Sequence, residues 1–127
     1  MKYIYIDGDN IGLQIEQSFL NNDEITLIQV NQDVHTIIRE ITNQLISATH
    51  QIIFSGADGI ISKSENLNIS NIQKIVDSLK TTNTFSVGIG NSLQDCYVAL
   101  RFAKSYSKNV IVTFLNGKFE VVNKNIA

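Results

Sequence analysis

Apolar and polar positions along the chain follow two periods, and each change of period marks a change of element. Short runs rich in β-branched and aromatic residues predict strands at 2–6, 51–55, 60–63, 84–90, 109–114 and 118–122. Apolar residues at helical spacing predict helices over about 11–19, 24–49, 70–82 and 92–103, the second with a break near Asn31. In the second helix, Ile25 and Ile28 are expected to belong to the core-facing stripe.

Capping and turn residues fall between these segments where the periodicity requires them. Asn21-Asn22-Asp23 ends the first helix and supplies a cap for the second. Ser92 and Asp95 form a capping box at the start of the last helix. Asn116-Gly117 is typical of a type I′ turn and closes a C-terminal hairpin.

The order of elements predicts the fold class. A βαββαβ core, with one extra helix and the C-terminal hairpin, is the α/β (α+β) pattern of the ferredoxin-like fold. Its sheet order, 4-1-3-2, places the third strand antiparallel beside the first. Asp58, just before the third strand, is thereby expected beside Asp7, just after the first.

Composition limits the class of protein. The 127 residues contain no linker-like stretch, which favours one domain over 1–127. The net charge is −2 and the basic residues are scattered, so we expect no duplex nucleic acid as partner. Cys96 is alone, and no apolar run approaches the ~20 residues of a membrane helix. With no secretory segment after Met1, we expect a cytoplasmic protein without direct membrane insertion.

Two acidic clusters carry the candidate chemistry: Asp7-Gly8-Asp9-Asn10 and Gly56-Ala57-Asp58-Gly59. Converging carboxylates within reach of water usually hold a divalent cation. The alternative is a plain turn, because Gly, Asp and Asn are favoured in turns. An EF-hand loop beginning at Asp7 fails, since Ile11 and Ser18 stand where its fifth and twelfth positions need oxygen ligands.

Four segments, in order and spacing, resemble the palm domains of nucleotidyl cyclases and polymerases. The closest resemblance is to the minimal CRISPR polymerase (mCpol) family, relatives of the palm in the large subunit of type III CRISPR complexes and of GGDEF diguanylate cyclases. It covers about residues 3–112. The segments are Tyr5-Ile6-Asp7-Gly8-Asp9-Asn10-Ile11-Gly12, Phe54-Ser55-Gly56-Ala57-Asp58-Gly59, Phe85-Ser86-Val87-Gly88-Ile89-Gly90, and 95–104 followed by Lys108-Asn109.

The resemblance implies a nucleotidyltransferase (EC 2.7.7-type) that makes a cyclic oligonucleotide signal in antiviral defence, most simply a cyclic dinucleotide from ATP. It implies that Asp7 and Asp58 are catalytic and bind two Mg²⁺ (or Mn²⁺) ions per site, with the carbonyl of Gly8 completing the ligand set. Asp9 is expected as an extra metal ligand.

The same resemblance implies where nucleotide binds. Backbone N–H groups at the first turn of the helix after strand one can cradle phosphate oxygens. A lysine in the last helix is expected to contact phosphate, although a solvated lysine is the usual alternative. The nucleotide-binding residues expected are Gly8, Asp9, Asn10, Ile11, Gly12, Gly56, Ala57 and Lys104.

The chain departs from the GGDEF pattern at three positions. Gly59 follows Asp58 where those cyclases carry a second acidic residue, so either Asp9 compensates or activity is weak. Gly12 and Ile15 stand where they carry Lys and the guanine-reading Asn, which argues against GTP as obligate substrate.

Other functions and partners follow from the resemblance. A degenerate palm that binds nucleotide or protein without catalysis is the main alternative, and a GTP cyclohydrolase is a weaker one. Joining two nucleotides favours a homodimer with opposed sites. The family also implies a separately encoded membrane effector that senses the product.

Several remaining side chains are assigned structural places. Tyr3, Tyr5, Phe54 and Phe85 fit strand interiors better than a base-stacking platform. His35 and His50 are expected at the surface or at helix ends, and Cys96 in the core.

Overall fold

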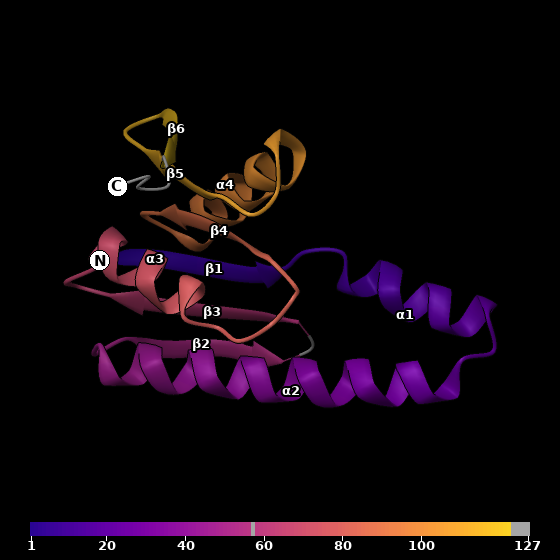
Figure 1. Cartoon of the computed structure of the whole chain (residues 1–127). Coiled ribbons are helices and arrows are strands. Elements are labelled where there is room, and N and C mark those ends of the chain that lie inside the picture. Colours follow the sequence, from indigo (N-terminus) through magenta and orange to yellow (C-terminus); the bar gives the residue numbers. More distant parts are fainter. Residues whose placement is uncertain (57, 123–127) are drawn as a thin grey trace.

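A computed structural model describes residues 1–56 and 58–122 of the chain as one six-stranded sheet with four helices (Figure 1). The strands are β1 (Lys2–Gly8), β2 (Gln51–Gly56), β3 (Gly59–Ser64), β4 (Phe85–Gly90), β5 (Ile111–Leu115) and β6 (Lys118–Val122). The helices are α1 (Ile11–Leu20), α2 (Glu24–Ser47), α3 (Ile69–Asp77) and α4 (Leu93–Tyr106). In the described part of the chain, none of these helices combines the length and apolar character needed to cross a membrane.

The sheet order is β2-β3-β1-β4-β5-β6, so the first four strands have the predicted 4-1-3-2 arrangement. β1 lies antiparallel to both β3 and β4, and β5 runs parallel to β4. The predicted fold class, with its extra helix and C-terminal hairpin, is confirmed. Because β1 is central, its last residues meet the start of β3 at one end of the sheet.

Helices pack on both faces of the sheet. Side chains of α2 and α3 join Ile4, Ile6, Val87 and Ile89 in the main core on one face. On the other face α4 packs against β4, and it approaches so closely that a Cβ at Gly88 would collide with the α4 backbone. Glycine in β4 is therefore what allows α4 to lie directly on the sheet.

The predicted caps and turn are confirmed. Asp23 accepts a hydrogen bond from the N–H of Thr26 at 3.0 Å, at the start of α2. Ser92 accepts one from the N–H of Asp95 at 3.1 Å, at the start of α4. Asn116 and Gly117 both have positive φ, 54° and 74°, as a type I′ turn requires.

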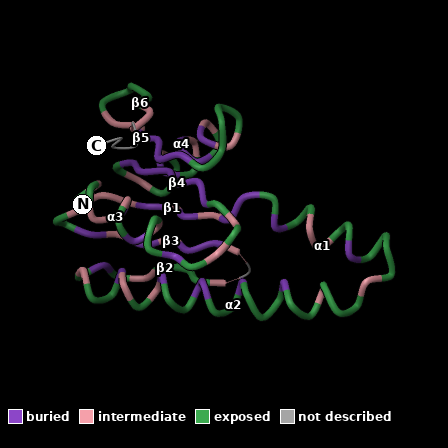
Figure 2. Tube along the Cα trace, viewed as in Figure 1, coloured by how far each residue is buried: buried purple, intermediate pink, exposed green. Residues whose placement is uncertain are grey.

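The helices differ from expectation in two ways. α2 runs unbroken through Asn31, and α3 ends at Asp77 rather than near Thr82 because the chain after it forms the loop into β4. Ile25 and Ile28 are 82% and 51% exposed, contrary to their expected core position. The reason is that α1 and the first half of α2 project beyond the end of the sheet, so the outer turns of α2 have no sheet to cover (Figures 1 and 2).

His50 follows the end of α2, where its N–H donates to the carbonyl of Leu45 at 3.0 Å, so its expected place at a helix end is right and the alternative of a surface position is wrong. Only 7% of it is exposed, and its Nδ1 lies 3.0 Å from the hydroxyl oxygen of Ser62. It directly precedes β2, so its ring packs inside rather than at a solvent-exposed helix end. Burial lowers the pKa of His50, because the charged imidazolium loses its hydration.

This burial predicts a pH dependence of stability. Since the folded-state pKa of His50 lies below its unfolded value of about 6.5, the unfolded chain takes up the proton first as pH falls. Full stability is therefore expected above about pH 6.5, with a decline below it of at most about 1.4 kcal/mol per pH unit. Urea unfolding from pH 8 to 5 measures this decline, and His50→Gln should flatten it. Exposed His35→Gln is the matched control. An unchanged slope in His50→Gln would contradict the assignment.

Candidate functional site

The two acidic clusters meet at one end of the sheet. Asp7 pairs with Gly59 in the β1–β3 ladder, and the N–H of Gly8 donates to the carbonyl of Asp58 at 2.9 Å. Burial raises the pKa of Asp7, Lys104 opposes that rise, and the charges of Asp58 and Asp9 add to it. The structure thus brings together the two carboxylates that the fold prediction placed side by side.

Lys104 of α4 lies against the end of β1. Its Nζ is 3.1 Å from Asp7 Oδ2, 2.7 Å from Asp9 Oδ1 and 3.0 Å from the carbonyl oxygen of Gly8. The ammonium group therefore contacts two carboxylates and a carbonyl at once. These oxygens form a site that attracts positive charge, and the half-buried Lys104 is part of it rather than a solvated helix residue.

Asp9 is held inside the protein, with 2% of it exposed. Oδ2 accepts hydrogen bonds from the Thr84 hydroxyl at 2.6 Å and the Asn109 N–H at 2.9 Å, and Oδ1 accepts from the Ser86 hydroxyl at 2.7 Å and from Lys104. Burial alone would raise the pKa of Asp9, but the hydrogen bonds from Lys104, Thr84 and Ser86 lower it overall. Four donors match the four lone-pair positions of a carboxylate, which favours a structural role over the expected extra metal ligand.

Sequence reasoning missed the partners of Asp9. Thr84, Ser86 and Asn109 come from the start of β4 and the loop before β5, far from Asp9 in sequence. Only Ser86 could have been found from the sequence, because it is the one residue with a hydroxyl group in the apolar strand Phe85–Gly90. The N–H group of Asn109 leaves none, because a backbone donor does not depend on residue type.

The start of α1 has the features expected of a phosphate cradle. Asn10 has a φ of 62° and makes no side-chain cap to α1, and its Oδ1 instead accepts from Lys108 Nζ at 2.6 Å. The first N–H groups of a helix have no intrahelical partner, which applies here to Ile11 and Gly12. Open space lies beside Gly12, whereas a Cβ at Gly8 would collide with the side chain of Ile11. A side chain at Gly8 would therefore need the Ile11 side chain to move, whereas Gly12 leaves room for a ligand.

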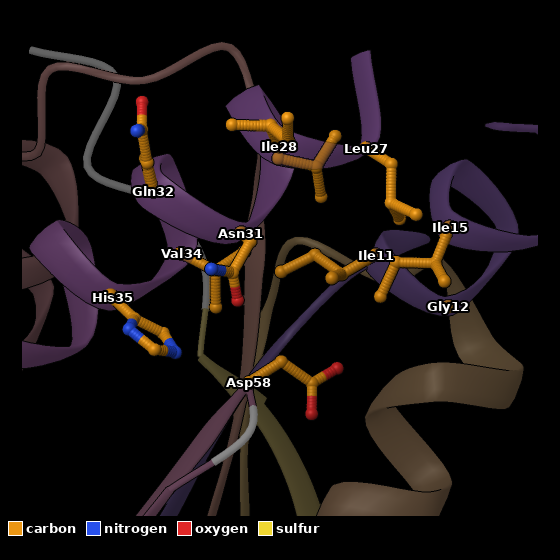
Figure 3. Close-up of a pocket in the computed structure, with 11 residues that line it drawn as sticks. Ile11, Gly12, Ile15, Leu27, Ile28, Asn31, Gln32, Val34, His35 and Asp58 are labelled. Atoms are coloured by element: carbon orange, nitrogen blue, oxygen red, sulfur yellow. The ribbon is translucent and has the colours of Figure 1, made fainter. Parts of the chain in front are cut away.

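A cavity of about 590 Å³ opens between α1 and α2 beside this site (Figure 3). Apolar side chains from both helices line it: Ile11, Ile15, Leu27, Ile28 and Val34. Asn31, His35 and Asp58 supply polar groups at its border. Asp58 therefore belongs both to the acidic site and to an apolar cavity, which is the usual construction of a small-molecule site.

Gly59 occupies the position of the missing second acid. A Cβ there would lie 2.9 Å from Asp7 Oδ1 and 3.1 Å from Tyr5 Cε1. Gly56 pairs with Gly59 at the end of β2 and has ordinary space around it. Ala57, expected to contact nucleotide, lies outside the described residues. The Asp7 carboxylate and the Tyr5 ring therefore use the space that a larger side chain at position 59 would need.

The oxygen groups suit a hard divalent cation. Over residues 1–56 and 58–122, no group of three or more His, Cys, Asp and Glu side chains is gathered for a metal. Mg²⁺ rarely needs such a cage, because it binds through one or two carboxylates and completes its shell with water and substrate phosphate oxygens. Asp7, Asp58 and the carbonyl of Gly8 fit that pattern.

Solved structures of similar fold are cyclase domains. The GGDEF domain of DgcB from Caulobacter crescentus, in complex with c-di-GMP, matches with a TM-score of 0.67 at 10% identity, over 88% of this chain and 76% of that one. The active GGEEF domain of a diguanylate cyclase from Vibrio cholerae matches with a TM-score of 0.63 at 17% identity, over 89% and 81%. A diguanylate cyclase/phosphodiesterase from Caldicellulosiruptor saccharolyticus matches with a TM-score of 0.61 at 19% identity, over 94% and 78%. At these identities the likeness shows the fold.

A search of curated proteins found no match. The family model of the minimal CRISPR polymerase domain, by contrast, matches residues 3–114, nearly the whole described chain and all of the site. The resemblance inferred from the four sequence segments is confirmed. The chain therefore belongs to the minimal CRISPR polymerase domain family.

Proposed function

We propose that this protein is a nucleotidyltransferase that joins two nucleoside triphosphates, ATP favoured, into a cyclic dinucleotide. The observation that carries the proposal is the meeting of the Asp7 and Asp58 segments, where the N–H of Gly8 donates to the carbonyl of Asp58 and Asp58 also borders the apolar cavity. Asp7, Asp58 and the Gly8 carbonyl would hold two Mg²⁺ or Mn²⁺ ions. Bound there, the ions would lower the pKa of an attacking hydroxyl and neutralise the triphosphate.

The donor nucleotide spans the acidic site and the cavity. Its base enters the space between α1 and α2, where Asn31 can hydrogen-bond a base edge and apolar side chains exclude water. Its phosphates lie at the start of α1, against the free N–H groups of the first turn. Asp58, which borders both spaces, sets the distance between them.

The reaction is an in-line displacement at the α-phosphorus. A ribose hydroxyl oxygen of the acceptor forms a bond to the donor's α-phosphorus, the bond to the bridging oxygen breaks, and pyrophosphate leaves with that electron pair. The hydroxyl proton passes to solvent. A second, identical displacement between the two joined nucleotides closes the ring.

Lys104 has two positions in this account. Without ligand its ammonium forms a salt bridge with Asp7 and donates a hydrogen bond to the Gly8 carbonyl. With cations bound at those oxygens, the ammonium would be free to contact phosphate, while its salt bridge to Asp9 holds it beside the site. Asp9 thus acts by positioning Lys104.

Two partners complete the proposal. A homodimer with opposed sites would bring two triphosphates face to face. The antiviral role and the separately encoded membrane effector stay predictions from the family resemblance, and the cytoplasmic location stays a prediction from the sequence composition.

The degenerate palm remains the second candidate, because Gly59 leaves the site one carboxylate short of the GGDEF pattern. Pyrophosphate release and nucleotide binding, measured on the same sample with ATP and Mg²⁺, separate the two. The proposed enzyme binds and releases pyrophosphate, whereas a degenerate palm binds without release. Formate from GTP would instead indicate a cyclohydrolase.

Restoring the missing acid is expected to harm the site. Gly59→Glu must displace the Asp7 carboxylate, whose oxygen would lie 2.9 Å from the new Cβ, and it adds a like charge. We expect Mg²⁺ to bind about tenfold more weakly in this variant by calorimetric titration. Gly56→Ala, whose Cβ meets only an ordinary contact at 3.6 Å, is the control. Tighter Mg²⁺ binding by Gly59→Glu would show that the position is open to a further ligand.

A further inference from the structure

One face of the sheet is covered by a helix over only half its width. On this face α4 packs directly on Gly88 and Gly90 of β4, where a Cβ would collide with the α4 backbone. Beyond β1, no helix of the described residues lies over β3 and β2 on this face (Figure 1). We call this surface the bare half-face, and its residues in register are Gln51, Phe54, Ile61 and Lys63.

The bare half-face is apolar at its centre. Phe54, Ile61 and Tyr5 pair in register across β2, β3 and β1, so they form one row. Phe54 is 54% exposed, whereas Ile61, Tyr5 and Tyr3 are half-buried. The expectation that Phe54 fills a strand interior is therefore wrong, although Phe85 is buried as expected. An exposed apolar surface next to a helix-covered one indicates a place for a further packing partner.

The bare half-face has the dimensions of one helix. Two strands span about 10 Å, and an α-helix with its side chains is about 10 Å across. The 14 residues of α4 extend about 21 Å, and the six residues of β2 or β3 extend about 20 Å. In this chain α2 and α3 lie on the opposite face and α1 projects beyond the sheet (Figure 1). A helix that covers the bare half-face must therefore come from another molecule.

The exposed edge of α4 is the matching surface. Leu93, Tyr97 and Arg101 recur at every fourth residue, so they share one side of the helix. Leu93 and Tyr97 are 49% and 52% exposed, and Arg101 is exposed as well. This side of α4 lies toward β1, because Lys104, one turn after Arg101, reaches Asp7. The bare half-face and the apolar edge of α4 are therefore neighbours, on either side of β1.

A two-fold axis above β1 and parallel to it joins these two surfaces. It places α4 of each copy over the bare half-face of the other, so that the same contact is made twice. Rotation about this axis leaves every residue at the same distance along the strands, so the acidic sites of the two copies face each other. An axis across the strands would instead set the acidic site against the far end of the other sheet. Opposed sites therefore favour the axis parallel to β1.

The same rotation brings an arginine to the partner's site. A Cβ at Gly88 would meet the backbone of Leu100, and Gly88 pairs with Tyr5. Lys104 reaches the end of β1. Arg101, between Leu100 and Lys104, is therefore level with the last residues of β1, and in the dimer it stands beside the other copy's acidic site. A guanidinium group there can bind phosphate through paired hydrogen bonds.

We propose that α4 of a second copy of this chain covers the bare half-face, and that Arg101 of each copy contacts the triphosphate bound by the other. The inference rests on the proposed function for the choice of axis and for the triphosphate. Dimer formation and triphosphate binding are both measured without turnover, so the test does not depend on product formation.

Sedimentation of nucleotide-free protein over a range of concentrations tests the interface. We expect a wild-type dimer that Phe54→Glu and Tyr97→Glu each weaken at least about thirtyfold, because each puts a charge into the contact. Tyr106→Glu is the matched control on the same helix, since Tyr106 stacks on Phe102 instead. Phe19→Glu is the control on α1, where Phe19 is 68% exposed. A monomeric wild type would overturn the proposal, as would a dimer that only Phe19→Glu dissociates.

Calorimetric titration with α,β-methylene-ATP and Mg²⁺ tests the contact made by Arg101. Arg101→Ala should weaken binding about tenfold in the dimer and leave it unchanged in the monomeric Phe54→Glu background, because the residue acts on the other copy. Equal weakening in both backgrounds would assign Arg101 to its own copy's nucleotide and overturn the proposal. No weakening in the dimer, or no binding by the wild type, would also overturn it. The predicted pattern in a protein that releases no pyrophosphate from ATP would support the interface while refuting the enzyme.

Discussion

Asp58→Asn is expected to reduce product formation at least about a thousandfold while the protein stays folded. Asp58 borders both the acidic site and the apolar cavity. An amide keeps the shape of the side chain but removes the charge that would help to hold divalent cations. Their stabilisation of the transition state is worth several kcal/mol, and each 1.36 kcal/mol is a factor of ten in rate. Pyrophosphate release with ATP and Mg²⁺ measures the effect.

The stability of this variant provides an independent check. Asp58 lies near Asp7, and like charges at close range repel, so Asp58→Asn should melt at the same temperature as the wild type or higher when no metal is present. Asp33→Asn, on an exposed turn of α2, is the control for removing a surface carboxylate. Full activity of Asp58→Asn would contradict the proposal that Asp7 and Asp58 together hold the divalent cations.

Asp9→Asn is expected to have the opposite signature, with a large loss of stability whether or not metal is present. The Asp9 carboxylate accepts from Lys104, Thr84, Ser86 and the Asn109 N–H. An amide turns one acceptor into a donor facing other donors, and it leaves part of the Lys104 charge unpaired. Breaking a buried pair costs about 3 kcal/mol, which is about 10 °C in melting temperature for a chain of this size. Thermal unfolding without divalent cations measures it.

Asp23→Asn provides the comparison, because Asn caps a helix about as well as Asp and the variant should melt near the wild type. If Asp9 were chiefly a metal ligand, Asp9→Asn would leave the metal-free protein as stable as before. That result would indicate that Asp9 is a metal ligand and would contradict its role in positioning Lys104.

Patterns local in sequence predicted much of this fold. The 4-1-3-2 order followed from element order alone, and the caps at Asp23 and Ser92 and the turn at Asn116-Gly117 each depend on residues within four positions. The meeting of Asp7 and Asp58 followed from the sheet order. Sequence patterns suffice to predict a feature when the interactions that form it join residues close together in the chain.

Other features depend on contacts that the sequence does not reveal. Helical periodicity places Ile25 on the core-facing stripe, but it does not reveal that the start of α2 extends beyond the end of the sheet. The network around Asp9 joins side chains and a backbone N–H as far away as Asn109. His50 is buried and Phe54 is exposed, contrary to expectation. The reason is that burial depends on which helix covers which part of the sheet. Each miss is a question of tertiary neighbours rather than of propensity.

The most direct test of the central claim is product analysis. Purified protein is incubated with each ribonucleoside triphosphate, singly and in pairs, with Mg²⁺ or Mn²⁺, and the products are separated by liquid chromatography and weighed by mass spectrometry. We predict a cyclic dinucleotide mass, formed from ATP and absent with Asp58→Asn. Unchanged triphosphate under every condition, from protein shown to be folded, would contradict it.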